Sequence, residues 1–177
     1  FALMCATAAG SMMILMAKIL GLQPDSGLTK QAAVAGVMII IGFNSFGRVF
    51  WGGMSDKLGR KKTLLILLVV AALSIVGVSF VKAYLMLAFI AIIGFSYGGF
   101  LGVFPALTAD FWGTRNVATI YGMILLGFGV GAVASSYTVA YFSATKAFST
   151  AFVIAGIAAV AGFVIIAYLK APKLKAE

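Results

Sequence analysis

Six long runs of apolar residues, separated by short polar segments, make up almost the whole chain. Each run approaches or exceeds the roughly 20 residues that an α-helix needs to cross the hydrocarbon core of a bilayer. A helix satisfies its backbone hydrogen bonds internally, so it is the expected form for such a run in lipid. The pattern predicts an all-α membrane protein with six transmembrane helices, at residues 1–23, 32–54, 63–81, 84–109, 117–142 and 148–169.

Glycine and proline indicate how some of these helices end and pack. Pro24 closes the first run, because proline has no amide proton to donate. Glycine lets a neighbouring helix approach closely, and Pro105 is expected to kink the last part of the fourth run. We therefore expect the fourth helix to be bent and tightly packed through its glycines, which are Gly94, Gly98, Gly99 and Gly102.

Composition supports a membrane location and removes most other classes of function. The chain is 63% hydrophobic and 10% charged, far from the averages of soluble domains. Its formal charge of +9 does not indicate a nucleic-acid partner, because the cations lie mostly in loops between apolar runs. With no histidine and one cysteine, Cys5, the sequence predicts no metal site, no cofactor and no internal disulfide. No enzyme active site is expected either, because all the acids lie in loops or the tail: Asp25, Asp56, Asp110 and Glu177.

Lys and Arg are distributed unevenly between the two sides of the predicted bundle. Loops on the cytoplasmic side of membrane proteins carry an excess of these residues. The richer side is therefore expected to be cytoplasmic, which places both ends of this chain in the cytoplasm. As a separate expectation, we assign the protein to the plasma membrane. Eight cations lie on that side (Lys57, Arg60, Lys61, Lys62, Arg115, Lys170, Lys173 and Lys175) and three on the other (Lys30, Lys82 and Lys146).

Arg48 is an ionisable residue at membrane depth, inside the run 32–54. A charge there costs about 2.5 to 3.5 kcal/mol on insertion scales, so such residues usually have a function. Asn44 lies one helical turn earlier on the same face, which lets an amide and a guanidinium face a small anion together. The alternative is that Arg48 snorkels to the interface, about 9 Å of helix rise away.

The loop after Arg48 resembles the signature loop between two helices of the major facilitator superfamily. Its pattern is a glycine, three residues, an aspartate, a cation, one residue, a glycine and a run of cations, in Gly52-Gly53-Met54-Ser55-Asp56-Lys57-Leu58-Gly59-Arg60-Lys61-Lys62. Arg48 and residues 105–113 and 116–122 resemble the C-terminal half, most closely that of monocarboxylate transporters and oxalate/formate antiporters. The resemblance implies that residues 1–177 form a six-helix half of a twelve-helix transporter, whose N-terminal half is a separate part that this chain lacks.

The resemblance also implies a conformational role for the signature loop. In the family, the aspartate equivalent to Asp56 latches the two halves together in the outward-open state. We therefore expect the partner of Asp56 to lie in the N-terminal half, outside this chain. The predicted latch residues are Gly52, Asp56, Gly59 and Arg60. A solvated turn with topology-setting cations is the alternative, above all for Lys57, Lys61 and Lys62.

The same resemblance predicts the class of substrate. It implies that the planar guanidinium of Arg48 pairs with a substrate carboxylate. Asn44 stands where animal monocarboxylate transporters have an aspartate proposed to couple protons, so the coupling residue is open. Oxalate-selective relatives carry a second cation on the stretch that corresponds to residues 127–129, which here are Gly-Phe-Gly. The expected function is therefore alternating-access transport of a monocarboxylate such as lactate, pyruvate or formate, coupled to protons. Oxalate/formate exchange and an assembly subunit without a substrate are the alternatives.

Aromatic side chains are expected to enclose the apolar part of such a substrate. Phe100 and Phe104 lie one turn apart in the fourth run, and Phe128 lies in the fifth. Tyr97 lies on a neighbouring face of the fourth run. The alternative is that these rings face lipid or pack between helices.

Overall fold

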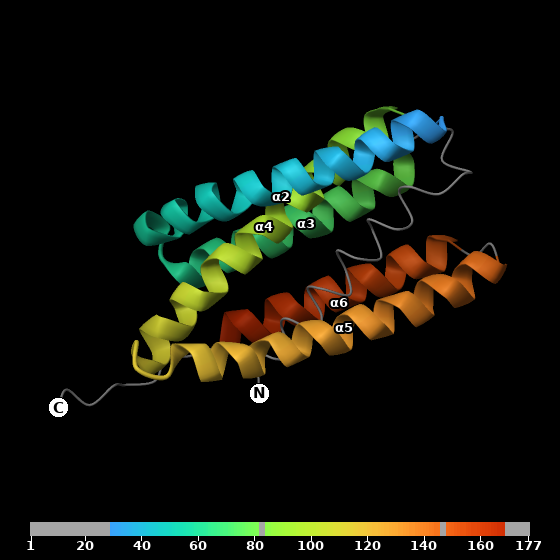
Figure 1. Cartoon of the computed structure of the whole chain (residues 1–177). Helices are drawn as coiled ribbons and strands as arrows, with labels where there is room; N and C mark the ends of the chain where they lie inside the picture. The colour runs from blue at the N-terminus through green and yellow to red at the C-terminus, as the bar shows by residue number, and fades with distance from the viewer. Residues whose placement is uncertain (1–28, 82–83, 146–147, 169–177) are drawn as a thin grey trace.

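The computed structural model describes residues 29–81, 84–145 and 148–168, which form five α-helices and the segments between them (Figure 1). This part of the chain is all-α, and its helices coincide with the second to sixth predicted spans. The first predicted span, 1–23, lies outside the described residues, as do Lys82, Lys146 and the basic C-terminus. The helices are α2 (Lys30–Leu58), α3 (Arg60–Phe80), α4 (Tyr84–Trp112), α5 (Val117–Thr145) and α6 (Phe148–Tyr168).

Four of these helices contain apolar stretches long enough to cross a membrane: Val34–Leu58, Arg60–Val78, Tyr84–Trp112 and Val117–Thr138. Large apolar side chains on them point outward, among them Met38, Leu73 and Val130. Water disfavours so much exposed apolar surface, whereas lipid accommodates it. The chain is therefore an integral membrane protein, as its hydropathy predicts.

A single glycine separates α2 from α3. Gly59 has φ of 90°, a left-handed conformation that side chains with a Cβ rarely adopt. Its backbone N–H donates to the Ser55 carbonyl oxygen at 3.0 Å, and its own carbonyl accepts from the Thr63 N–H at 3.1 Å. The Thr63 hydroxyl donates to the same Gly59 carbonyl at 3.0 Å. These bonds satisfy groups at both helix ends and explain why so short a loop can reverse the chain.

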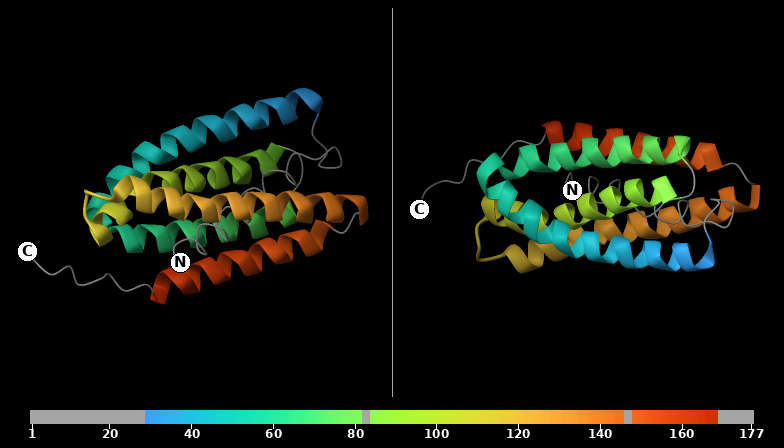
Figure 2. Two further views of the ribbon diagram at one scale, coloured as in Figure 1. Left: turned by 60° about the horizontal axis from the view of Figure 1, so that its bottom comes forward. Right: turned by 90° about the horizontal axis from the view of Figure 1, so that it is seen from above.

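α4 is the central helix of the bundle, and α2 and α3 both pack along it. α6 packs along α3, while α5 makes smaller contacts with α4 and α6. Figure 2 shows the helices lying side by side along the length of the molecule. The sequence neighbours α2 and α3 thus meet mainly through α4, which lies later in the chain.

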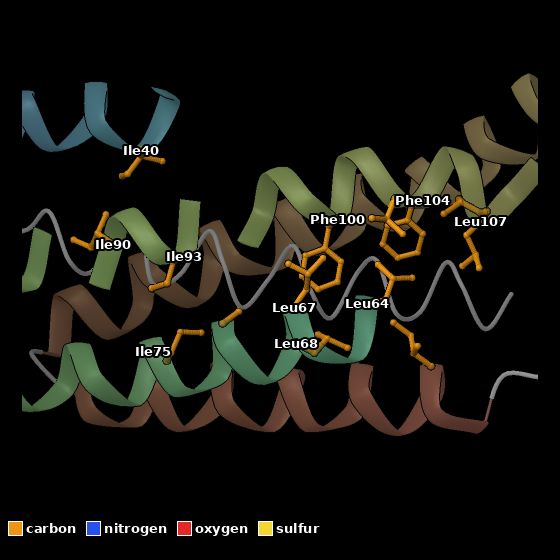
Figure 3. Packing of buried hydrophobic residues seen from close by; sticks show 14 of the residues in the cluster. Ile40, Leu64, Leu67, Leu68, Ile75, Ile90, Ile93, Phe100, Phe104 and Leu107 are labelled. Atoms are coloured by element: carbon orange, nitrogen blue, oxygen red, sulfur yellow. The ribbon is translucent and has the colours of Figure 1, made fainter. Parts of the chain in front are cut away.

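The hydrophobic core lies where α3 and α4 face each other (Figure 3). Leu64, Leu67 and Leu68 of α3 are at most 1% exposed, and Ile90 and Ile93 of α4 are at most 2% exposed. These side chains are almost completely enclosed by their neighbours. Close packing of this kind fixes the position of α3 relative to α4. The core also contains Ile40 of α2, Ile124 of α5 and Ile166 of α6, so every described helix contributes to it.

Glycines allow α2 and α4 to touch through their backbones. A Cβ added at Gly98 would collide with the carbonyl oxygen of Asn44, and one at Gly102 would lie 2.7 Å from that of Arg48. A Cβ added at Gly47 of α2 would likewise collide with the carbonyl oxygen of Phe95. The predicted close packing at the glycines of α4 is therefore confirmed, and it takes place at the backbone of the candidate site.

Candidate functional site

Arg48 and Asn44 lie one turn apart on α2, with their backbones held against the glycines of α4. The Arg48 residue is exposed and Asn44 is half-buried. In the described part of the chain both acids, Asp56 and Asp110, pair with Arg60, so neither of them neutralises Arg48. The close contact between α2 and α4 thus fixes the backbone at Arg48. The positive charge of its guanidinium is not neutralised by either described carboxylate.

Two phenol groups lie within range of the Arg48 charge. They belong to Tyr97 of α4 and Tyr121 of α5, and the guanidinium acts electrostatically on both. The Tyr97 ring stacks on Phe128 of α5, with ring centroids 5.9 Å apart. The surroundings of Arg48 thus include Tyr97 and Tyr121, with Phe128 stacked on Tyr97. Arg48, Tyr97 and Phe128 are among the residues that the sequence predicts for the site.

Tyr121 is a residue of the candidate site that the sequence interpretation missed. It lies seven residues before Phe128, and residues seven apart occupy nearly the same face of a helix. Given that Phe128 is expected at the site, this spacing is the signal that points to Tyr121. Its phenol adds a hydrogen-bond donor to a wall that the sequence predicts from apolar rings.

Phe100 and Phe104 lie in the core of the bundle. They are 6% and 4% exposed, and their rings stack with centroids 6.0 Å apart. Figure 3 shows both rings among the leucines of α3. Packing between helices, the alternative considered for them, accounts for both side chains, so the site proposed below does not include them.

A separate aromatic cluster lies on the other flank of the contact between α2 and α4. Phe95 of α4 is its centre, with centroid distances of 5.8 Å to Phe46, 5.3 Å to Phe50 and 5.6 Å to Trp51. Because Phe95 and Tyr97 flank the glycines on opposite sides of α4, this cluster and the polar site lie on opposite sides of one helix contact. The rings add apolar packing that supports the position of Arg48.

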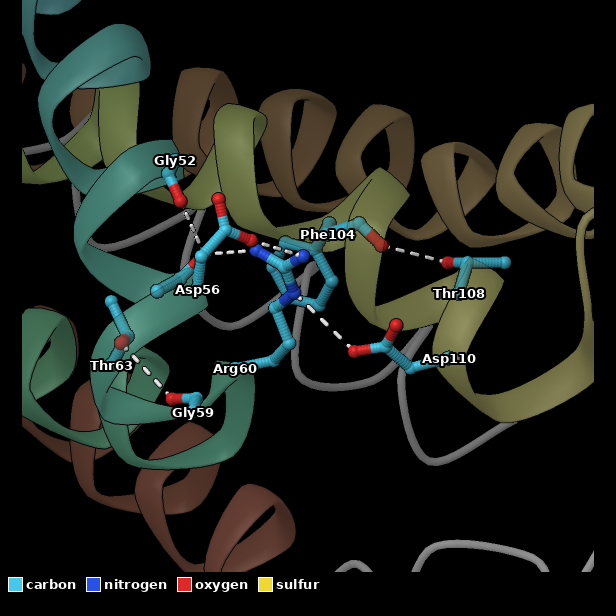
Figure 4. A network of polar contacts seen from close by, with 9 residues as sticks. Gly52, Asp56, Gly59, Arg60, Thr63, Phe104, Thr108 and Asp110 are labelled. Atoms are coloured by element: carbon cyan, nitrogen blue, oxygen red, sulfur yellow. Dashed lines mark hydrogen bonds and ion pairs between the residues drawn. The ribbon is translucent and has the colours of Figure 1, made fainter.

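Polar residues join the ends of α2, α3 and α4 (Figure 4). Arg60 pairs with Asp56 at 2.5 Å and with Asp110 at 3.3 Å. It also donates to the Ser55 hydroxyl at 2.5 Å, which in turn donates to the Gly52 carbonyl at 2.7 Å. All the predicted latch residues therefore take part in one local structure, with Gly59 forming the turn.

This network corrects one expectation. The partner of Asp56 was expected outside the chain, but Arg60 of α3 supplies one within it. Asp110 was assigned to a loop, whereas it lies in the last turn of α4, where the helix dipole disfavours an unpaired negative charge. A nearby cation offsets this cost, and Arg60 provides it.

The comparisons with known proteins agree with this structure. The model of the Major Facilitator Superfamily matches residues 1–177. An uncharacterized MFS-type transporter of Escherichia coli (strain K12), YhjX, is 36% identical over 104 residues, which are 58% of this chain and 26% of the relative. The oxalate:formate antiporter of Oxalobacter formigenes is 29% identical over 146 residues, or 81% of this chain and 35% of the relative.

A third relative is the probable transporter MCH1 of Debaryomyces hansenii, 26% identical over 125 residues, or 67% of this chain and 25% of the relative. The chain thus spans about a quarter to a third of the length of these relatives. The family match, in contrast, extends over the whole chain and agrees with its membrane-length helices. The chain belongs to the Major Facilitator Superfamily.

Proposed function

We propose that this chain is the C-terminal six-helix half of a secondary transporter for small monocarboxylates such as lactate, pyruvate or formate. Substrate binds near the middle of the membrane, between this half and an N-terminal half, and the two halves rock in alternating access. The observation that carries the proposal is Arg48, an exposed cation in a membrane-length helix that neither described acid neutralises. A substrate carboxylate supplies the missing negative charge.

The surroundings of Arg48 support one bound carboxylate. The guanidinium accepts a carboxylate through two parallel hydrogen bonds, and the Asn44 amide and the phenols of Tyr97 and Tyr121 are neutral donors for the remaining oxygen lone pairs. The stacked ring of Phe128 gives an apolar surface for a short carbon tail. The other described cations lie towards helix ends or in loops, so a dianion finds no second charge at this depth.

Two observations bear on the mode of transport, which is either proton symport or anion exchange. Both described acids lie at the cation-rich end of the bundle, so a proton that accompanies the substrate is carried by a group elsewhere in the transporter. The relative from Oxalobacter formigenes is named an oxalate:formate antiporter, which supports anion exchange as the second candidate. We retain proton symport across the plasma membrane as the first, because the site itself provides for a single negative charge.

Replacing Arg48 by lysine tests the site directly in the full-length transporter. Lysine keeps the positive charge and can still snorkel, but it cannot form the bidentate pair. Loss of the charge-assisted bonds should cost about 1.5 to 3 kcal/mol, or roughly tenfold to over a hundredfold in affinity. Asn44→Ala should cost less, because the amide is uncharged. Equilibrium binding of radiolabelled lactate, pyruvate, formate and oxalate measures both effects.

Arg115→Lys is the matched control, because Arg115 is exposed in the turn between α4 and α5. It should bind all four anions like the wild type. Wild-type affinity in Arg48→Lys would falsify the anchor role and leave snorkelling as the explanation of this arginine. Tighter binding of oxalate than of formate would favour the exchanger, and binding of none of the anions by the wild type would favour a membrane assembly subunit.

A further inference from the structure

An apolar groove lies between α3 and α6, away from the anion site. It has a volume of about 220 Å³ and is lined by Leu68, Val69, Ala72, Leu73, Val160 and Phe163. Leu73 and Val160 are 66% and 62% exposed, so the groove opens to the surroundings of the bundle. Because α3 is a membrane-length helix, those surroundings are lipid.

One stripe of α3 connects this groove to the cation-rich end of the bundle. Its residues recur every three or four positions and so share a helix face. All of them are exposed: Lys62, Ile66, Val69 and Leu73. Val69 and Leu73 form the α3 wall of the groove, and Lys62 lies about 10 Å of helix rise before Val69. A long molecule with an apolar chain and one charged end could therefore lie in the groove and reach Lys62 along this face of α3.

Lys62 also lines a hollow of about 340 Å³ at the cation-rich end, formed by the ends of α2 and α4 and the start of α3. Arg60, Lys61 and Asp110 line it too, and the first turn of α3 itself contains no acid. The free N–H groups at the start of a helix already make this end positive, so consecutive cations there favour an anion. Arg60 is paired with two carboxylates, and the Lys61 ammonium donates to the Ala167 carbonyl at 2.6 Å. Neither described acid pairs with Lys62.

We propose that these surfaces form a binding site for an anionic phospholipid. One acyl chain lies in the groove between α3 and α6, and the phosphate of the headgroup binds Lys62 at the mouth of the hollow. The contact between Lys61 and Ala167 holds the ends of α3 and α6 together at that level. Tyr168, 82% exposed at the end of α6, supplies a phenol at the depth of the headgroups, where tyrosine is enriched. The site is independent of Arg48 and of the proposed substrate.

Lipid titrations of the purified full-length transporter test this site, with thermal unfolding in mixed micelles as the readout. Phosphatidylglycerol should raise Tm in a saturable way, and phosphatidylcholine with the same acyl chains should raise it much less. Glycerol 3-phosphate, which has the charge without the chains, should have no effect. Lys62→Gln should weaken phosphatidylglycerol binding about fivefold. Leu73→Trp should weaken it at least as much, because the added ring fills the groove.

Two matched variants control for charge and size. Lys57→Gln removes another exposed cation at the same end, and Val76→Trp enlarges an exposed side chain of α3 that lies beyond the groove and outside the proposed site. Both should bind phosphatidylglycerol like the wild type. Wild-type affinity in either Lys62→Gln or Leu73→Trp overturns the proposal, as does equal stabilisation by phosphatidylcholine or by glycerol 3-phosphate alone. A disulfide formed between a cysteine at position 73 and one in residues 1–23 also overturns it, because the chain's own segment then fills the groove.

Discussion

At the scale of single residues, the site joins one cation to several neutral donors. A lone guanidinium at membrane depth is costly, and neutral phenols beside it do not remove that cost. They do shape the way an anion can bind, because a phenol O–H points a donor at a carboxylate oxygen without adding charge. In the proposed site, the position of Tyr121 on α5 makes a bound anion a link between α2 and α5, two helices that meet little by themselves.

Tyr121→Phe tests this role by removing the hydroxyl and keeping the ring. Loss of one hydrogen bond should cost about 0.5 to 1.5 kcal/mol, or roughly twofold to tenfold in affinity for labelled formate. Tyr137→Phe, at a 76% exposed position of the same helix, should leave affinity unchanged. If both variants bind formate like the wild type, Tyr121 serves for packing and not for binding.

Some of these residues were predictable from the sequence and some were not. Arg48 and Asn44 stand out because polar groups are rare in an apolar run. Phe100 and Phe104 gave no such signal, since lipid and helix core are equally apolar and a phenylalanine suits either. The pairing of Arg60 with Asp110 joins residues 50 positions apart, so it depends on the packing of α3 against α4 and not on local pattern.

At the scale of helices, the contact between α2 and α4 rests on small residues. Hydropathy predicts the extent of each span but not the face that packs, because no water distinguishes the outer face in lipid. The glycines of α4 carry this information, and the structure confirms that Gly94, Gly98 and Gly102 face α2. The proposed substrate site therefore depends on a close helix contact as well as on its own side chains.

Substitutions of two glycines in α2 should separate close packing from helix propensity. Gly47→Ala places a methyl group against the Phe95 carbonyl oxygen and should destabilise the protein by about 1 to 3 kcal/mol. At Gly42 nothing in the described chain lies within 4 Å, so Gly42→Ala should be neutral or stabilise by about 0.5 to 1 kcal/mol. Thermal unfolding in detergent measures both. Equal unfolding temperatures for the two variants would contradict the packing described for α2 and α4.

At the scale of the whole molecule, the charged ends of the helices define its orientation in the membrane. Lys57 and Arg115 are exposed at the cation-rich end of the bundle, and Tyr84 is exposed at the start of α4, at the opposite end. An excess of Lys and Arg marks the cytoplasmic side. The cation-rich end is thus the end that we expect to face the cytoplasm.

Cysteine labelling tests this orientation after Cys5 is replaced by serine. Lys57→Cys and Arg115→Cys should react with an impermeant thiol reagent only when the reagent reaches the cytoplasmic side. Tyr84→Cys should react only from the outside. Labelling of Lys57→Cys or Arg115→Cys from the outside would reverse the orientation and move the proposed lipid site to the outer leaflet.

The network at the cation-rich end has a second consequence for the whole molecule. Arg60 joins the ends of α2, α3 and α4 into one unit, as the proposed rigid-body movement of a half requires. The Asp56 side chain is nevertheless 61% exposed, which leaves carboxylate surface for contact with the proposed N-terminal half. Asp110 uses the same arginine and is 54% exposed, but it lies on α4 and outside the signature loop. Substituting each aspartate in turn therefore tests the predicted latch between halves against a brace within one half.

Asp56→Asn should shift the transporter towards inward-open states, because the latch that closes the cytoplasmic side loses its charge. Asp110→Asn removes the same charge from the same arginine, but it should mainly lower the unfolding temperature and change the conformational balance less. Accessibility of single cysteines in the cytoplasmic and outer vestibules measures the balance in each variant. Equal shifts in the two variants would mean that the network acts as a brace alone. Unchanged accessibility in Asp56→Asn would remove the latch role while leaving the proposed binding role of Arg48 intact, because the two sites share no described contact.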